Sequence, residues 1–140
     1  MLILDTNVVA ELFRPAPDAN VTKWYWSADP EDLFVTAITK AESFLGCVLM
    51  PAGRRRQIFE DVLRAFYERS VLTQILPFGS DEAMQFAELV SHHQAIGRPI
   101  GEFDAQIAAI ARVRGFAVVT RNVRDFADCG IEIINPWESA

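Results

Sequence analysis

The chain alternates between short apolar runs and longer stretches in which apolar residues recur at helical spacing. Leu2–Leu4 is an apolar run that begins at the second residue and ends on Asp5 and Thr6. Apolar side chains then return at Val8 and Val9 and again one turn later, which is the spacing of one face of a helix. We therefore predict a buried strand over Leu2–Leu4 that leads directly into a helix.

The same order of strand and helix recurs along the rest of the chain. Helices are predicted at about 18–27, 38–50, 54–69, 81–96 and 102–114, and a polar turn over 121–128. Strands that are separated by helices favour a parallel sheet covered on both faces. We expect one α/β domain over residues 1–140, with a central, mostly parallel sheet of four or five short strands and helices on both faces. The later strands are predicted at Leu33–Thr36, Thr73–Leu76, Phe116–Thr120 and Ile131–Ile134.

Composition and charge narrow the class of protein. Hydrophobic residues make up 51% of 140 residues, enough to build the core of one folded domain. The net charge of −6 disfavours a protein that coats nucleic acid by bulk attraction, but it allows a site where clustered carboxylates hold cations. Cys47 and Cys129 match no metal-ligand spacing, and no apolar run reaches the ~18 residues that span a bilayer. We expect a cytoplasmic protein with no membrane segment.

Acidic and amide side chains occur where predicted strands and helices meet. Asp5 follows the first strand, and Glu42 lies one turn into the helix after the second. Asp104 lies in the first turn of the last long helix, and Asn122 and Asp125 follow the strand after it. The carboxyl ends of parallel strands share one edge of a sheet, so these side chains can converge there. Converging oxygen ligands suit Mg²⁺ or Mn²⁺ better than zinc.

Each of these carboxylates, taken alone, also has a purely structural interpretation. Asp5 could cap the first helix, and Asp104 could complement a helix dipole. Thr39–Glu42 has the S/T-x-x-E pattern of a capping box, which would make Glu42 structural. Their occurrence after consecutive elements of one sheet favours a shared site.

Four short motifs, taken in order, resemble those of PIN domains. They are LDTN at 4–7, TKAE at 39–42, FDAQIAA at 103–109 and TRNVRDF at 120–126. The match is closest to the VapC/FitB-like group, the ribonuclease toxins of type II toxin–antitoxin modules, and Asn135–Trp137 is similar to that group's tail. The resemblance extends over essentially the whole chain.

The resemblance implies a Mg²⁺-dependent endoribonuclease, with Mn²⁺ as a substitute ion, in which a metal-activated water hydrolyses RNA phosphodiester bonds. Asp5, Glu42 and Asp104 would be the core acidic ligands. Thr6 and Thr120 would orient ligands or water.

The fourth ligand position departs from the most acidic members of the family. Asn122 stands where some members carry an aspartate, and an amide oxygen coordinates Mg²⁺ without adding charge. Asp125, three residues on, either compensates for that charge or caps the turn.

The resemblance also implies partners. A homodimer is expected, together with a small antitoxin from the adjacent gene that could inhibit by inserting an Arg or Lys near the carboxylates. The high apolar content, which suggests exposed hydrophobic surface, agrees with this. Among the basic residues, Arg54–Arg56 are interpreted as a solvated face or as a surface for an acidic partner. Better candidates for contacts with RNA are Arg112, Arg114, Arg121 and Arg124.

Two other functions remain open at this point. One is a catalytically inert PIN-like module that binds RNA or protein. The other is a haloacid-dehalogenase-like phosphatase, which also has an aspartate after its first strand but needs a second aspartate two residues later, where this chain has Asn7. His92–His93 have no acidic or cysteine partner at ligand spacing, so metal binding there is not expected.

Overall fold

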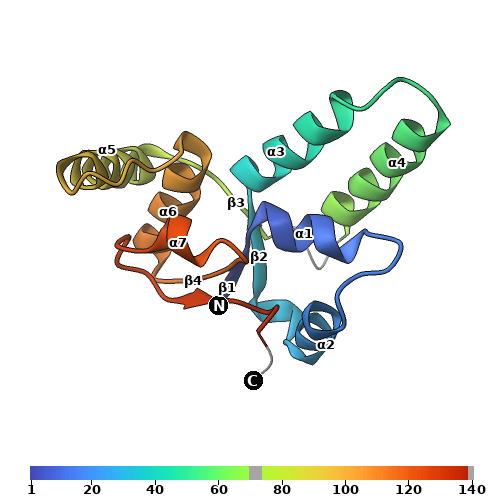
Figure 1. The fold of residues 1–140 in the computed structure, drawn as a ribbon, viewed down its shortest axis with the longest axis horizontal. Coiled ribbons are helices and arrows are strands. Elements are labelled where there is room, and N and C mark those ends of the chain that lie inside the picture. The colour runs from blue at the N-terminus through green and yellow to red at the C-terminus, as the bar shows by residue number, and fades with distance from the viewer. Residues whose placement is uncertain (70–73, 139–140) are drawn as a thin grey trace.

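The structure is a computed structural model that describes residues 1–69 and 74–138, and its centre is a parallel sheet. Over these residues five strands are ordered β3-β2-β1-β4-β5, and every neighbouring pair is parallel (Figure 1). The predicted fold class is therefore confirmed. The strands are β1 (Leu2–Leu4), β2 (Leu33–Thr36), β3 (Ile75–Leu76), β4 (Ala117–Val119) and β5 (Ile133–Ile134).

Strands β3, β4 and β5 are shorter than the sequence pattern predicts. β5 begins at Ile133 rather than Ile131, and β4 excludes Phe116 and Thr120 at its two ends. Thr73, the first residue of the predicted third strand, lies outside the described residues. Strand ends depend on hydrogen bonds to neighbouring strands, which an apolar run does not encode.

The helices alternate with the strands as predicted, with one addition. α7 is a short helix inside the stretch 121–128, which the sequence pattern predicts as a polar turn. None of the helices in the described ranges is long and apolar enough to cross a membrane. The helices are α1 (Thr6–Leu12), α2 (Ala19–Ser27), α3 (Ala37–Val48), α4 (Arg54–Glu68), α5 (Ser80–Ala95), α6 (Glu102–Arg114) and α7 (Val123–Phe126), with a 3-10 turn η1 (Pro30–Asp32) before β2.

The helices form two layers, one on each face of the sheet (Figure 1). Successive side chains of a strand point to opposite faces, so β1 contributes to two separate cores. Leu4 packs with buried residues of α1, α2, α3 and α4, such as Val8 and Leu63. Ile3 packs with buried residues of α5, α6 and α7, such as Leu89 and Ile107. The strand ends between these layers are where the candidate site lies.

The start of α3 differs from the capping-box interpretation. The N-cap is Thr36, whose Oγ1 accepts a hydrogen bond from the backbone N–H of Thr39 at 3.0 Å. Thr39 therefore lies inside the helix, and the proposed box between Thr39 and Glu42 is wrong. The Glu42 side chain therefore does not cap this helix and can take part in the candidate site.

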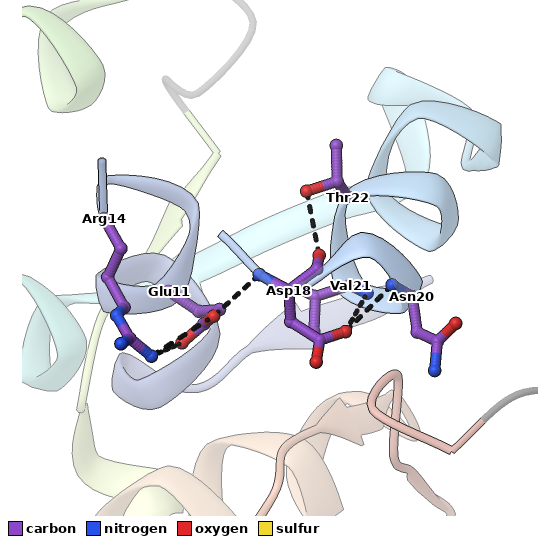
Figure 2. A network of polar contacts seen from close by, with 6 residues as sticks. All are labelled: Glu11, Arg14, Asp18, Asn20, Val21 and Thr22. Atoms are coloured by element: carbon purple, nitrogen blue, oxygen red, sulfur yellow. Dashed lines mark hydrogen bonds and ion pairs between the residues drawn. The ribbon is translucent and has the colours of Figure 1, made fainter. Parts of the chain in front are cut away.

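A buried carboxylate fixes the turn from α1 to α2 (Figure 2). Glu11 Oε1 accepts a hydrogen bond from the backbone N–H of Asp18 at 2.8 Å, and its Oε2 accepts one from Arg14 Nη1 at 3.1 Å. The Asp18 carboxylate in turn caps α2 by accepting from the backbone N–H groups of Asn20 and Val21. The hydrogen bond from Asp18 is the main reason that the pKa of Glu11 lies below its usual value.

Candidate active site

Asp5 lies at the carboxyl end of β1 and is only 4% exposed. Its Oδ1 accepts a hydrogen bond from the backbone N–H of Thr6 at 2.7 Å, which caps α1. Its Oδ2 accepts hydrogen bonds from Thr120 Oγ1 at 2.8 Å and from Asn7 Nδ2 at 3.0 Å. A carboxylate has about four acceptor positions. The three bonds therefore leave Asp5 one acceptor position, on Oδ1, so the helix cap and a ligand role are compatible.

Thr120 and Asn7 together hold Asp5 in place. Thr120 is fully buried after β4, and its Oγ1 also accepts from Asn7 Nδ2 at 3.1 Å and from the backbone N–H of Asn122 at 3.0 Å. Asn7 Oδ1 accepts from the backbone N–H of Arg121 at 3.2 Å. The side chain of Asn7 thus joins the start of α1 to the end of β4.

The role of Asn7 was missed by sequence reasoning, which treated the residue only as the absence of a second aspartate. Its position just after an Asp-Thr pair at a strand end was the available signal, because short polar side chains commonly bond to nearby backbone and side-chain groups at such turns.

Glu42 reaches the site from α3. Its Oε1 accepts a hydrogen bond from Thr6 Oγ1 at 2.8 Å, so Thr6 contacts Asp5 through its backbone and Glu42 through its hydroxyl. Burial raises the pKa of Glu42, the bond from Thr6 opposes this, and the charge of Asp5 adds to the rise. Thr6 therefore lies between the first two predicted ligands, as expected of a residue that orients them.

Asp104 projects from the first turn of α6 and is strongly affected by the other acidic groups. Its pKa rises to about 6, chiefly through burial and then through the negative charges of Asp5, Asp125 and Glu42. Burial also raises the pKa of Asp5, against hydrogen bonds from Thr120 and Thr6. The charges of the other three carboxylates thus all act on Asp104, which indicates that the four groups lie near one edge of the sheet.

Asn122 and Asp125 lie at opposite ends of the first turn of α7. Asn122 is the N-cap residue, but its side chain forms no capping hydrogen bond. Asp125 is solvent-exposed, yet its charge raises the pKa of both Asp5 and Asp104. Of the two residues, Asp125 therefore adds a negative charge to this edge, whereas Asn122 offers an uncharged amide oxygen.

The chemistry of these side chains fits a hard divalent cation. Across residues 1–69 and 74–138, no three His, Cys, Asp or Glu side chains are arranged so that they would already hold an ion. The donors are nevertheless all oxygens, which Mg²⁺ and Mn²⁺ prefer. A cation would offset the repulsion that raises the pKa of Asp104, and Asp5 Oδ1 retains an acceptor position for it.

Comparison with known proteins identifies the family. Residues 2–131 match the model of the PIN domain. The chain belongs to the PIN-domain family. The motifs at Asp5, Glu42 and Asp104 predict this membership, and the match confirms it.

Individual relatives narrow the group within the family. VapC ribonuclease Y4jK from Sinorhizobium fredii is 41% identical over 140 residues, covering 100% of both chains. Toxin FitB from Neisseria gonorrhoeae is 35% identical, covering 98% of this chain and 99% of FitB. The crystal structure of FitAcB from N. gonorrhoeae superposes with a TM-score of 0.87 at 34% identity, covering 99% of this PIN domain and 100% of that chain. Other similar structures are VapBC toxin–antitoxin proteins. This PIN domain is therefore VapC/FitB-like.

Proposed function

We propose that this PIN domain, residues 1–140, is the toxin of a type II toxin–antitoxin module and an endoribonuclease that cleaves RNA phosphodiester bonds with a divalent metal. The observation that carries the proposal is that carboxylates gather at one edge of the sheet. Thr6 donates hydrogen bonds to both Asp5 and Glu42. Burial, together with the charges of Asp5, Asp125 and Glu42, raises the pKa of Asp104. The ribonuclease and toxin names of its full-length relatives support the substrate and the biological role.

Asp5, Glu42 and Asp104 would hold Mg²⁺, with Mn²⁺ as a substitute, and Asp125 is a stronger candidate than Asn122 for the fourth position. The bound ion would supply a water of lowered pKa and offset the charge of the scissile phosphate. No histidine, cysteine or serine nucleophile is needed in this scheme.

The neighbouring polar residues orient the carboxylates. Thr120 and Asn7 occupy Oδ2 of Asp5, so that Oδ1 is presented to a ligand. The hydroxyl of Thr6 holds Oε1 of Glu42, which leaves Oε2 for the ion. These bonds limit the rotation of both carboxylates and reduce the reorganisation that metal binding requires.

The two alternative functions fit the site less well. In the phosphatase, the position of Asn7 would carry a second carboxylate, whereas here its amide donates to Asp5 and Thr120. In an inert binding module, the repulsion at Asp104 would destabilise the fold, and no bound cation would offset it. Metal-dependent cleavage accounts for both observations.

We further propose a small antitoxin from the adjacent gene and a homodimer as partners, in the cytoplasm. The solved relatives include VapBC members of toxin–antitoxin systems. The hairpin of α3 and α4 also leaves large apolar side chains exposed, which is typical of a contact surface. They are Leu45, Val48, Leu49, Ile58 and Val62. Co-expression with the adjacent open reading frame, followed by light scattering, should give a complex; a stable monomer that binds no such product would contradict the proposal.

The cleavage proposal is tested by incubating RNA with purified protein in Mg²⁺ and in EDTA. Asp5→Asn and Asp104→Asn should each reduce the cleavage rate by about 100-fold or more, because each removes a ligand charge from the metal. Glu11→Gln is a matched control, since it neutralises a buried carboxylate at the other end of α1. Cleavage that persists in EDTA or in both variants would contradict the metal mechanism. Hydrolysis of a phosphate monoester but not of RNA would favour the phosphatase.

A further inference from the structure

A cavity of about 310 Å³ lies beside the acidic edge, in a part of the molecule that the proposed metal chemistry does not use. Its walls come from three elements: the end of α5 at His93, the segment 98–101 before α6, and α7 with the residues after it. Ligand sites typically start at about 300 Å³, so the cavity fits one small group rather than an extended chain.

The cavity adjoins the candidate metal ligands on two sides. Asp125 forms part of its wall and is also one of the carboxylates that repel Asp5 and Asp104. Gly101 forms another part, and a Cβ atom added there would lie 3.6 Å from Asp104 Oδ2. A group bound in the cavity would therefore be an immediate neighbour of a group bound at the carboxylates.

Two arginines lie in the wall of this cavity, together with the carboxylate of Asp125. Arg98 Nη1 donates to Asp128 Oδ2 at 2.9 Å in a solvent-exposed ion pair, which orients the guanidinium and leaves its other N–H groups for a ligand. Arg124 is exposed on α7 and forms no ion pair within residues 1–69 and 74–138. Guanidinium groups bind phosphate with two parallel hydrogen bonds, so this wall is suited to a phosphate.

A buried histidine fixes the shape of the cavity. His93 is 3% exposed, and its Nδ1 and Nε2 lie 2.8 Å from Leu89 O and 3.1 Å from Ala127 O. The ring thus connects α5 to the residues after α7. The backbone N–H of Arg98 also donates to His93 O at 2.9 Å. The walls are therefore held together before any ligand binds.

A second hollow on the other side of α7 is less suited to a phosphate. It shares Arg124 and Asp125 with the first, but its wall also contains the carboxylate of Glu138. The Arg121 guanidinium there lies 5.3 Å from the ring centroid of Trp137, and this stacking restrains it. The first cavity is thus the better place for an anion beside the acidic edge.

We propose that this cavity binds the RNA nucleotide next to the scissile bond, with Arg98 and Arg124 holding its phosphate. The proposal rests on the proposed RNA cleavage and adds where the strand is held. It also explains how an acidic protein brings a polyanion to a cluster of carboxylates. The guanidinium groups of Arg98 and Arg124 would bind one phosphate beside the carboxylates, which would hold the metal next to the neighbouring phosphodiester bond.

The test is equilibrium binding of a fluorescein-labelled single-stranded RNA decamer, measured in EDTA over a series of salt concentrations. Arg98→Ala and Arg124→Ala should each weaken binding about 10-fold at low salt. Each should also reduce the slope of log K against log salt by about 0.7, the value for one lost phosphate contact on a single strand. Arg55→Ala is the matched control, because it removes the same charge from an exposed site on α4 and should leave the slope unchanged.

The outcomes separate this proposal from the proposed function, because the binding assay needs no metal and no cleavage. Unchanged slopes in both cavity variants, or an equal loss in Arg55→Ala, would overturn the cavity proposal even if the wild-type protein cleaves RNA with Mg²⁺. Reduced slopes in the cavity variants, with no cleavage by the wild-type protein, would uphold RNA binding at the cavity and overturn the proposed function. Urea denaturation of each variant confirms that it is folded.

Discussion

The two ends of α1 carry buried acidic side chains whose pKa values are shifted in opposite directions. At its last turn Glu11 is buried, and donors from Asp18 and Arg14 lower its pKa. At its N-cap Asp5 is equally buried, but its pKa is raised, and so is that of Asp104 nearby. The charged form of Glu11 is stabilised by donors from the protein itself. The carboxylates around Asp5 bring several negative charges together without a positively charged partner from the described part of the chain.

We interpret this difference as that between a structural acid, Glu11, and a proposed metal ligand, Asp5. Glu11 is paired with one guanidinium and one backbone N–H, as buried charges usually are. Asp5 and Glu42 are instead bound by hydroxyl and amide donors. Over the described residues neither they nor Asp104 and Asp125 form an ion pair. Such an arrangement reduces the stability of the empty fold and is typical of sites that bind a cation.

The largest expected effect distinguishes the two candidates for the fourth ligand. Asp125→Asn should lower the rate of RNA cleavage by 10- to 100-fold, because it removes a charge that acts on Asp5 and Asp104. Asn122→Ala should change the rate by no more than about 3-fold, since this exposed side chain forms no capping bond. Initial rates at a fixed Mg²⁺ concentration measure both. The reverse order of effects would assign the position to Asn122.

Adding Mg²⁺ should stabilise the folded protein through the carboxylates near Asp5, and this stabilisation should not depend on Glu11. At 100 times its dissociation constant, Mg²⁺ should raise the free energy of unfolding by about 2.7 kcal/mol. The increase should be largely lost in Asp104→Asn and retained in Glu11→Gln, as measured by urea denaturation with and without Mg²⁺. Equal stabilisation of both variants would place the ion elsewhere.

Neutralising the structural acid should destabilise the protein. Glu11→Gln should lower the free energy of unfolding by about 1.5 kcal/mol at pH 7, because it weakens hydrogen bonds to a charged acceptor. Since the pKa of Glu11 is lowered, this stability is present above its ordinary value of 4.5 and is lost as the pH falls through the lower, folded-state pKa. The variant and the wild-type protein should therefore converge in acid; a difference that does not shrink would contradict the assignment.

Neutralising Asp104 should change the free energy of unfolding by a smaller amount than neutralising Glu11, and in the opposite direction. The pKa of Asp104 is raised from 3.8 to about 6, so stability from its protonated form is present below pH 3.8 and lost as the pH rises through 6. Metal-free Asp104→Asn should thus be more stable than wild type at pH 7.5, by about 1 kcal/mol after allowance for solvent screening. Urea denaturation in EDTA measures the difference, and a less stable variant would refute the repulsion.

Much of the fold was predictable because its central strands carry a strong signal. β1, β2 and β4 are continuous apolar runs, and the polar residues that end them fix where the site lies. The two-residue strands β3 and β5 at the sheet edges have little sequence signal: their last residues were predicted correctly, but both strands are shorter than predicted. α7 is a single turn of helix, which is too short for helical periodicity to indicate.

The sequence indicates which carboxylates belong to the candidate site, but it does not indicate all of the residues that hold them in place by hydrogen bonds. Motif order identified Asp5, Glu42 and Asp104, whereas the contact of Asn7 with Thr120 joins residues far apart in the chain. The capping box at Thr39 failed because Thr36, at the end of β2, caps the helix first. The sequence places Asn122 ahead of Asp125 as the fourth ligand, and the coupling of Asp125 to Asp104 depends on the position of α7, which the sequence does not indicate.

The most direct test is an NMR titration of the Asp104 side-chain carboxyl carbon against pH, in EDTA and then in Mg²⁺. Without metal the carboxyl should titrate near pH 6, because burial and the charges of Asp5, Asp125 and Glu42 raise its pKa. With Mg²⁺ its pKa should fall, because the cation favours the charged form. A carboxyl that titrates near 3.8 without metal, or whose pKa does not respond to Mg²⁺, would contradict a cation site at this edge of the sheet.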